Sequence, residues 1–286
     1  MLKWLQEGLS WRWRRFTRHR YLRKTFRNGR ALAQSYLDCT ACDTAVCHDG
    51  SVIRHPPSRT GLAGMILEIW YDEVCTGRFY APAPGDVIID AGANIGLFSL
   101  LVARRQPDCK VFAYEPFEQN FQLLSENLAV AGASAVRAFP FALAGESGAS
   151  AMSDGGGRSQ DHQLTVGPPA DAGRPTVRTC SLAEVLEMTG AEAVQLFKCD
   201  IEGSERDLFA AATAETIRRV RRYAIEYHDN IRPGTLDLLI ERLGPSHVID
   251  LRPAGEGGYG MLYAIDKTAE PGAAADSGAR FVSGSS

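Results

Sequence analysis

From Asp86 onward, short apolar runs alternate with segments in which apolar residues recur every three or four positions. Short runs bounded by turn residues are typical of buried strands, and the three-to-four spacing is typical of amphipathic helices. The expected strands cover residues 87–89, 110–114, 135–141, 194–198, 222–227, 247–251 and 261–265. The expected helices cover residues 96–105, 121–132 and 236–243. This alternation predicts a parallel sheet covered on both faces, a doubly wound α/β domain of about seven strands.

Two further elements are expected ahead of this domain. Apolar residues at spacings of three or four predict an amphipathic helix over residues 2–27; they are Leu2, Leu5, Leu9, Trp13 and Phe16. Residues 44–54 predict a β-hairpin, because Asp49-Gly50 supplies the positive φ angles of a tight turn. The pattern divides the chain into a helical arm (1–36), a hairpin and helix preamble (37–84), the α/β domain (85–267) and a disordered tail (268–286).

Residues 145–175 interrupt the alternation. They are dense in Gly, Ser, Pro and Asp, with Gly155-Gly156-Gly157 at the centre. A long connection without regular structure inside a compact domain is typical of a functional lid or of disorder. We expect this segment to close over a substrate.

Charge separates the N-terminal arm from the rest of the chain. Residues 1–30 hold ten basic residues and one acid and carry +9, whereas the other 256 residues carry −12. An acidic body argues against a general nucleic-acid binder. Tryptophan and leucine beside arginines are typical of a helix lying on anionic lipid, and the alternative is a helix whose apolar stripe packs on the α/β domain.

Hydropathy and cysteine content bear on the compartment. The sequence has no apolar run of the ~20 residues that a membrane span needs, and arginines interrupt the N-terminus where a signal peptide would be apolar. Seven cysteines, an odd number, argue against a secreted disulfide framework. We expect a cytoplasmic protein, with peripheral contact at the inner membrane face as an option for residues 1–30. Cys39, Cys42, Cys47 and His48 could suggest zinc, but no second ligand pair follows, which favours unligated cysteines.

The first two strands of the α/β domain end in residues suited to a nucleoside. Asp90-Ala91-Gly92-Ala93-Asn94-Ile95-Gly96 follows the first strand, and glycines there let the backbone turn sharply beside a ligand. A dinucleotide site would need glycines where Asn94 and Leu97 stand. Glu115, at the tip of the second strand, can accept hydrogen bonds from both hydroxyls of a ribose.

Four ordered motifs resemble the FkbM family of S-adenosylmethionine-dependent methyltransferases, and the resemblance spans about residues 44–266. The motifs are Val87–Gly96, Ala113–Asn120, Phe197–Glu205 and Ile225–His228. The resemblance implies a class I methyltransferase fold with S-adenosylmethionine above the carboxyl ends of the central strands. It also implies that Asp90, Gly92, Asn94 and Gly96 line the methionine side and that Glu115 holds the ribose. Cys199 and Ser204 depart from the residues that are usual in the family.

The later motifs supply candidate catalytic groups. Asp200 and Glu202 could contact the cofactor ammonium or the acceptor hydroxyl, whereas Ser204 could simply cap a helix. Glu226 and His228 are two apart on one strand and share a face. His228 is the leading candidate for the general base, because histidine titrates near neutrality. As an alternative, Asp200, Glu226 and His228 could hold Mg²⁺ or Mn²⁺.

Two residues are further candidates for contact with the acceptor: Tyr80, at the end of the preamble, and His162, within residues 145–175. The sequence favours methyl transfer from S-adenosylmethionine to a hydroxyl of a small molecule, either a natural product or a sugar unit. The alternatives are a nicotinamide-dependent oxidoreductase, which Asn94 and Leu97 disfavour, and a non-catalytic membrane-associated module, which the acidic motifs disfavour. The mass of the bound cofactor distinguishes a methyltransferase from the oxidoreductase. Methyl transfer to any acceptor excludes the non-catalytic module.

Overall fold

The computed structural model describes residues 2–56, 61–76, 79–153, 163–165, 176–255 and 257–268. A seven-stranded sheet forms its centre, in the order β12-β13-β11-β10-β3-β4-β5. The strands are β3 (Val87–Ala91), β4 (Lys110–Tyr114), β5 (Val136–Phe139), β10 (Leu196–Cys199), β11 (Arg222–His228), β12 (His247–Pro253) and β13 (Tyr259–Asp266). The expected class I methyltransferase fold with about seven strands is confirmed.

The sheet is mixed, which corrects the expectation of a wholly parallel one. β13 lies antiparallel to both β11 and β12, while the other pairings in the sheet are parallel. The connection from β12 to β13 is short, and a short connection can only join antiparallel neighbours. The parallel strands all end at the same edge, where the sequence places its candidate site residues.

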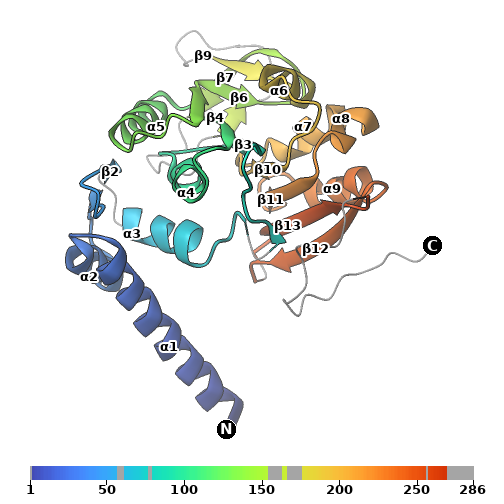
Figure 1. The fold of residues 1–286 in the computed structure, drawn as a ribbon. Coiled ribbons are helices and arrows are strands. Elements are labelled where there is room, and N and C mark those ends of the chain that lie inside the picture. The colour runs from blue at the N-terminus through green and yellow to red at the C-terminus, as the bar shows by residue number, and fades with distance from the viewer. Residues whose placement is uncertain are drawn as a thin grey trace.

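Helices cover both faces of this sheet (Figure 1). Alternate residues of β3 point to opposite sides: Ile89 joins a core with the helices α6, α7, α8 and α9, and Ile88 packs with α4. These helices are α4 (Leu97–Arg105), α6 (Leu182–Thr189), α7 (Glu205–Ala211), α8 (Ala214–Arg218) and α9 (Thr235–Leu243), and α5 (Glu118–Val130) packs on the same side as α4. The three expected helices are confirmed, whereas α6, α7 and α8 were not predicted.

Residues 135–141 were expected to form one strand, but they are divided between two sheets. β5 ends before Pro140, and β6 (Phe141–Leu143) begins after it. Proline has no N–H for a sheet ladder, so the chain leaves the first sheet at this position.

The expectation that residues 145–175 lack regular structure is wrong for the described part of that segment. β6 joins a four-stranded sheet in the order β6-β9-β7-β8, with β7 (Gly148–Ser153), β8 (Gln163–Thr165) and β9 (Thr176–Cys180). Each pair except β6 and β9 is antiparallel. Backbone pairing therefore fixes strands in a sequence whose composition alone indicated a loop.

The N-terminal elements are α1 (Leu2–Thr25), α2 (Gly29–Asp38), the hairpin β1 (Thr44–Val46) and β2 (Val52–Arg54), α3 (Gly61–Ile66) and the π-helix η1 (Leu67–Tyr71). The helix over residues 2–27 and the hairpin are confirmed. Buried residues of α1, α2, the hairpin and η1 share one core with α4 and α5. The preamble is thus packed against the sheet's helical layer, and η1 is brought to the edge where the strands end.

Candidate active site

One cavity of about 730 Å³ lies at the carboxyl ends of β3, β4, β10 and β11. Its size is that of a small-molecule site. Of the predicted site residues, Gly92, Asn94, Glu115, Asp200, Glu202, Glu226 and His228 all line it. The described lining holds five carboxylates, one lysine and one histidine: Glu68, Glu115, Asp200, Glu202, Glu226, Lys198 and His228. An acidic lining suits a ligand that carries positive charge.

Gly92 lets β3 and β10 approach each other at the floor of the cavity. Its φ is +74°, and a Cβ placed there would lie 1.8 Å from the backbone oxygen of Asp200. The Asp200 N–H in turn donates to the Ala91 oxygen at 3.1 Å. The clash would be with the protein backbone, so the close approach of the Gly92 loop to Asp200 requires glycine at this position.

Gly92→Ala should therefore cost more stability than the same change at Gly132, which also has positive φ but where an added Cβ would meet nothing within 4 Å. The left-handed backbone penalises alanine by ~1–2 kcal/mol at either position. Overpacking against the Asp200 carbonyl should add a further ~1–3 kcal/mol at Gly92 only. Thermal or urea unfolding of the two variants measures the difference, and equal destabilisation would contradict this close approach.

Glu115 is a buried carboxylate held in place by the backbone. The N–H of Asn94 donates to its Oε2 at 2.7 Å, and the N–H of Phe117 donates to its Oε1 at 2.9 Å. Burial raises the pKa of Glu115 to about 7, although both backbone hydrogen bonds oppose this shift. Asn94 reaches its position through a left-handed φ of +50°. The loop after β3 and the tip of β4 thus jointly orient a carboxylate at the cavity wall.

Asp90 lies beneath the cavity and does not line it, which corrects its predicted place. It is fully buried; its Oδ1 lies 3.2 Å from Lys198 Nζ, and its Oδ2 accepts a hydrogen bond from Ser99 at 2.7 Å. Lys198 also donates to the Gly92 oxygen at 2.6 Å. Burial alone would lower the pKa of Lys198, but Asp90 and Asp200 outweigh it and raise that pKa above its ordinary value. The Asp90–Lys198 pair therefore supports the Gly92 loop from below.

Gly96 also lies off the cavity. It begins α4 with a φ of +89°, and a Cβ there would meet Leu124 Cδ1 of α5 at 2.5 Å. The positive φ of Gly96 favours glycine at the start of α4, and the residue is absent from the cavity lining, where its predicted place was.

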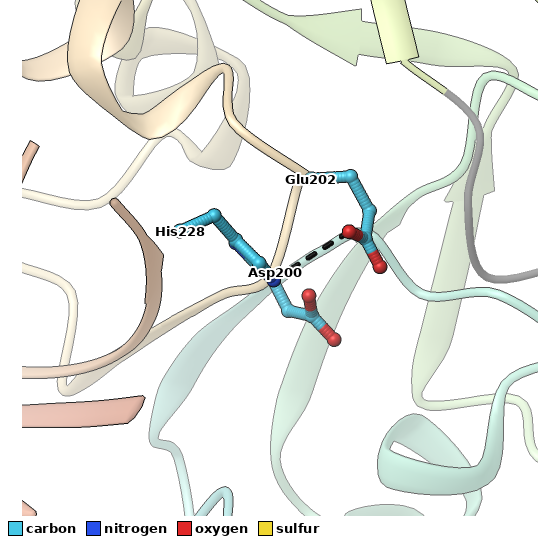
Figure 2. Close-up of side chains that lie close together, drawn as sticks. All are labelled: Asp200, Glu202 and His228. Carbon is cyan, nitrogen blue, oxygen red and sulfur yellow. Dashed lines mark ion pairs between the residues drawn. The ribbon is translucent and has the colours of Figure 1, made fainter. Parts of the chain in front are cut away.

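Asp200, Glu202 and His228 gather where β10 and β11 end (Figure 2), whereas Glu115 follows β4, on the other side of β3 in the sheet. One donor atom from each of the three lies within 4.8 Å of the others. β10 ends at Cys199, and Glu202 enters the cluster through a left-handed φ of +51° followed by Gly203. A loop, and not continued strand alternation, thus brings Glu202 to His228.

Glu205 orients His228 from behind. Its carboxylate is fully buried, and Oε1 lies 3.1 Å from His228 Nδ1 while also accepting the N–H of Ile201 at 3.0 Å. This contact leaves His228 Nε2 on the side of Glu202, whose Oε2 is 3.5 Å away. A buried carboxylate on one ring nitrogen fixes the plane and the tautomer of the imidazole.

The charges around His228 change its expected titration. Burial alone would lower the pKa of His228, but the hydrogen bond to Glu205 and the charges of Glu205, Asp200 and Glu202 raise it to about 9. Burial and the nearby Asp200 raise the pKa of Glu226 to about 8. The surrounding carboxylates therefore favour the protonated form of His228 in the ligand-free protein.

The remaining predicted residues lie elsewhere. Tyr80 does not line the cavity; its hydroxyl donates to Asp86 at 2.6 Å, so its predicted contact with the acceptor is replaced by a structural one. His162 lies outside the described residues. Ser204 precedes α7 but makes no side-chain capping bond. Among the described residues, Cys39, Cys42, Cys47 and His48 do not form a metal-ligand group.

Three residues in or beside the cavity were not among the candidates from the sequence: Glu68, Lys198 and Glu205. Glu68 comes from η1, where burial and Asp200 raise its pKa, and an acid within the apolar run of residues 65–71 was the available signal. Lys198 and Glu205 both stand inside the Phe197–Glu205 motif. Sequence proximity could not show that Glu205 folds back beneath His228.

The fold is that of class I methyltransferases, and comparisons with known proteins give the family. The model of the methyltransferase FkbM domain matches residues 90–244. A 31-O-demethyl-FK506 methyltransferase from Streptomyces tacrolimicus is 29% identical in an alignment of 192 residues that covers 56% of this chain and 74% of that protein. Methyltransferase sdnD from Sordaria araneosa is 30% identical in an alignment of 213 residues that covers 61% of this chain and 80% of that protein.

The family match covers more than half of the chain, and the chain belongs to the FkbM family of methyltransferases. Family membership implies S-adenosylmethionine as the methyl donor. Among solved structures, a protein from Streptococcus mutans described as a methyltransferase in complex with SAH is 13% identical, with a TM-score of 0.41 over 64% of this chain and 89% of that one.

Proposed function

We propose that the protein transfers the methyl group of S-adenosylmethionine to a hydroxyl of a small molecule, either a natural product or a sugar unit. The observation that carries this proposal is the meeting, in one cavity, of the backbone-held carboxylate of Glu115 with the Asp200–Glu202–His228 cluster. The name of the Streptomyces tacrolimicus relative, a 31-O-demethyl-FK506 methyltransferase, supports oxygen as the acceptor atom.

The residues present fit the methyl donor. Glu115 offers two carboxylate oxygens to the ribose hydroxyls, and Gly92 and Asn94 line the adjoining loop. The donor carries an ammonium and a sulfonium, which suit the acidic lining. A bound cation also favours the ionised forms of Glu68 and Glu226, whose pKa values burial raises in the ligand-free protein. When bound, S-adenosylmethionine supplies a methyl group already activated by the positive sulfur. The protein then has to align the acceptor oxygen with that methyl group and exclude water.

His228 is the proposed general base. Its Nε2 faces the cavity cluster, and Glu205 stabilises the imidazolium that forms when the acceptor hydroxyl gives up its proton. Asp200 is proposed to position the acceptor hydroxyl or the donor's ammonium. Proton transfer by a positioned side chain typically contributes ~10²- to 10⁴-fold to the rate.

The same cluster supports a metal-dependent alternative. Asp200, Glu202 and His228 offer two carboxylates and an imidazole, a donor set suited to Mg²⁺ or Mn²⁺. Glu202 stands where the sequence had suggested Glu226, which is not in the group of donor atoms within reach of one another.

Treatment with EDTA followed by dialysis separates the two mechanisms. If His228 is the base, turnover should stay within about twofold of the untreated enzyme, because proton transfer to imidazole needs no cation. Loss of turnover that Mg²⁺ or Mn²⁺ restores would contradict the base and support the metal site.

The activity itself is tested with labelled S-adenosylmethionine and a panel of hydroxyl-bearing small molecules. The proposal expects label in an ether product that resists mild base, together with release of S-adenosylhomocysteine. Transfer of label only to nitrogen, carbon or carboxylate acceptors would overturn the O-methyl assignment while leaving the family intact.

A further inference from the structure

The second half of α1 is fixed to the body of the protein. Leu22 and Phe26 have 0% and 1% of their surface exposed, and the ring of Phe26 lies 5.7 Å from that of Trp70. Arg18 pairs with Asp72, and the ring of Tyr21 lies 5.1 Å from that of Tyr71. These contacts attach α1 to η1, the element that also brings Glu68 and Ile69 to the cavity.

α1 extends away from the body toward its N-terminus, and Trp13 and Phe16 lie near the middle of this helix (Figure 1). Trp13 and Phe16 are 67% and 55% exposed, with ring centroids 6.1 Å apart. At about 100° per residue, Trp13 lies about 180° from Leu22 around the helix and Phe16 about 120° from it. Trp13 and Phe16 therefore face away from the side that packs, and these two side chains do not pack on the α/β domain.

Basic residues continue the same outward face. Arg20 and Lys24 lie within about 20° of Trp13 around the helix, and Arg23 lies within about 20° of Phe16. All three are exposed. In the sequence, Leu2, Leu5 and Leu9 continue the spacing of three or four that Trp13 and Phe16 share. From residue 13 onward, one face of α1 thus carries two aromatic rings followed by cations.

We propose that α1 is a peripheral anchor that seats the enzyme on an anionic membrane surface. Aromatic rings beside arginines match the boundary between acyl chains and negatively charged headgroups. The charge of +9 in residues 1–30 makes pairing with a second copy of this arm unfavourable and suits an anionic partner. Among the described helices, none has an apolar stretch sufficient to span a bilayer. α1 packs on η1, and η1 itself lines the cavity. A single element therefore connects the anchor to the cavity.

Vesicle co-sedimentation of the full chain tests this anchor. We expect binding to vesicles of phosphatidylcholine with about one third phosphatidylglycerol at low salt, no binding to pure phosphatidylcholine, and release as salt rises. Replacing both rings (W13S/F16S) should weaken binding by about tenfold or more, because their burial is lost. The charge reversal R23E/K24E should weaken it by a similar factor.

The matched control is Ile240→Ser, another exposed apolar residue, 38% exposed on α9, which should bind like the parent. Equal affinity of all variants for S-adenosylhomocysteine shows that the fold and the methyl-donor site are intact. Absence of binding to anionic vesicles at low salt overturns the anchor. So does a dimer, seen by light scattering, that W13S/F16S dissociates, because the stripe would then be covered by a second copy.

Discussion

Replacing His228 with alanine should lower turnover by roughly 10²- to 10⁴-fold while affinity for S-adenosylhomocysteine changes little. The imidazole is the group that Glu205 holds toward Asp200 and Glu202, and alanine leaves no side chain there to accept the acceptor's proton. Steady-state turnover with labelled S-adenosylmethionine gives the rate, and calorimetry with S-adenosylhomocysteine gives the affinity.

His48→Ala is the matched control, because His48 lies outside the cavity in the β1–β2 hairpin and contacts the Lys24 oxygen. Its turnover should equal that of the parent. The turnover of Glu205→Gln should fall between those of His228→Ala and His48→Ala. The amide can still hydrogen-bond to His228 but carries no charge to stabilise the imidazolium. Parent-like turnover by His228→Ala at neutral pH, with no effect of EDTA, would assign proton removal to Asp200 or to desolvation of the hydroxyl.

The pH profile gives this prediction a second readout. The base must be neutral, and the pKa of His228 in the ligand-free protein is raised to about 9. The quotient kcat/KM should therefore fall about tenfold for each pH unit below 9, because it reports the free enzyme. The positive charge of the bound donor lowers the pKa of His228 in the complex. The plateau of kcat should therefore extend to a lower pH than the plateau of kcat/KM. Glu205→Gln should move the kcat/KM profile to lower pH, a shift that a purely structural role would not produce.

Replacing Glu115 with alanine should weaken binding of S-adenosylmethionine by ~2–3 kcal/mol, or about 30- to 150-fold. The variant removes the acceptor for both ribose hydroxyls and leaves the N–H groups of Asn94 and Phe117 without their carboxylate partner. Calorimetry measures the affinity directly and needs no acceptor substrate.

Glu118→Ala controls for the loss of one negative charge, because Glu118 is exposed at the start of α5, three residues further along. It should bind the donor like the parent. Glu115→Gln preserves the volume and should retain part of the affinity. An unchanged affinity in Glu115→Ala would remove Glu115 from the ribose site.

Sequence reasoning brought together residues that the structure places in one cavity where those residues lie at or just after the ends of strands. Glu115, Asp200 and His228 were predicted because the carboxyl ends of parallel strands meet at one edge. The same reasoning misplaced Asp90, whose position on β3 points into the core, where Lys198 and Ser99 bind it. Alternation along a strand gives the face of a residue but not its depth below the ligand.

Other features depend on contacts that no local pattern records. Glu205 follows its strand closely in sequence, yet its role comes from folding back to His228, 23 residues away. The strands β7 and β9 arise from mutual pairing in a segment rich in glycine and serine. The sequence left open whether the apolar residues of α1 face the body or the solvent. The structure shows that the turn around Tyr21 and Leu22 packs on η1 and that Trp13 and Phe16 are exposed.

A crystal structure of the protein with S-adenosylhomocysteine tests the central claim most directly. That claim is that Glu115 binds the ribose and that His228 lies beside the reacting sulfur in the same cavity. The account predicts both ribose hydroxyls within about 3 Å of the Glu115 carboxylate. It also predicts the sulfur at the end of the cavity that Asp200, Glu202 and His228 line. A ribose bound away from Glu115, or a sulfur directed away from His228, would contradict it.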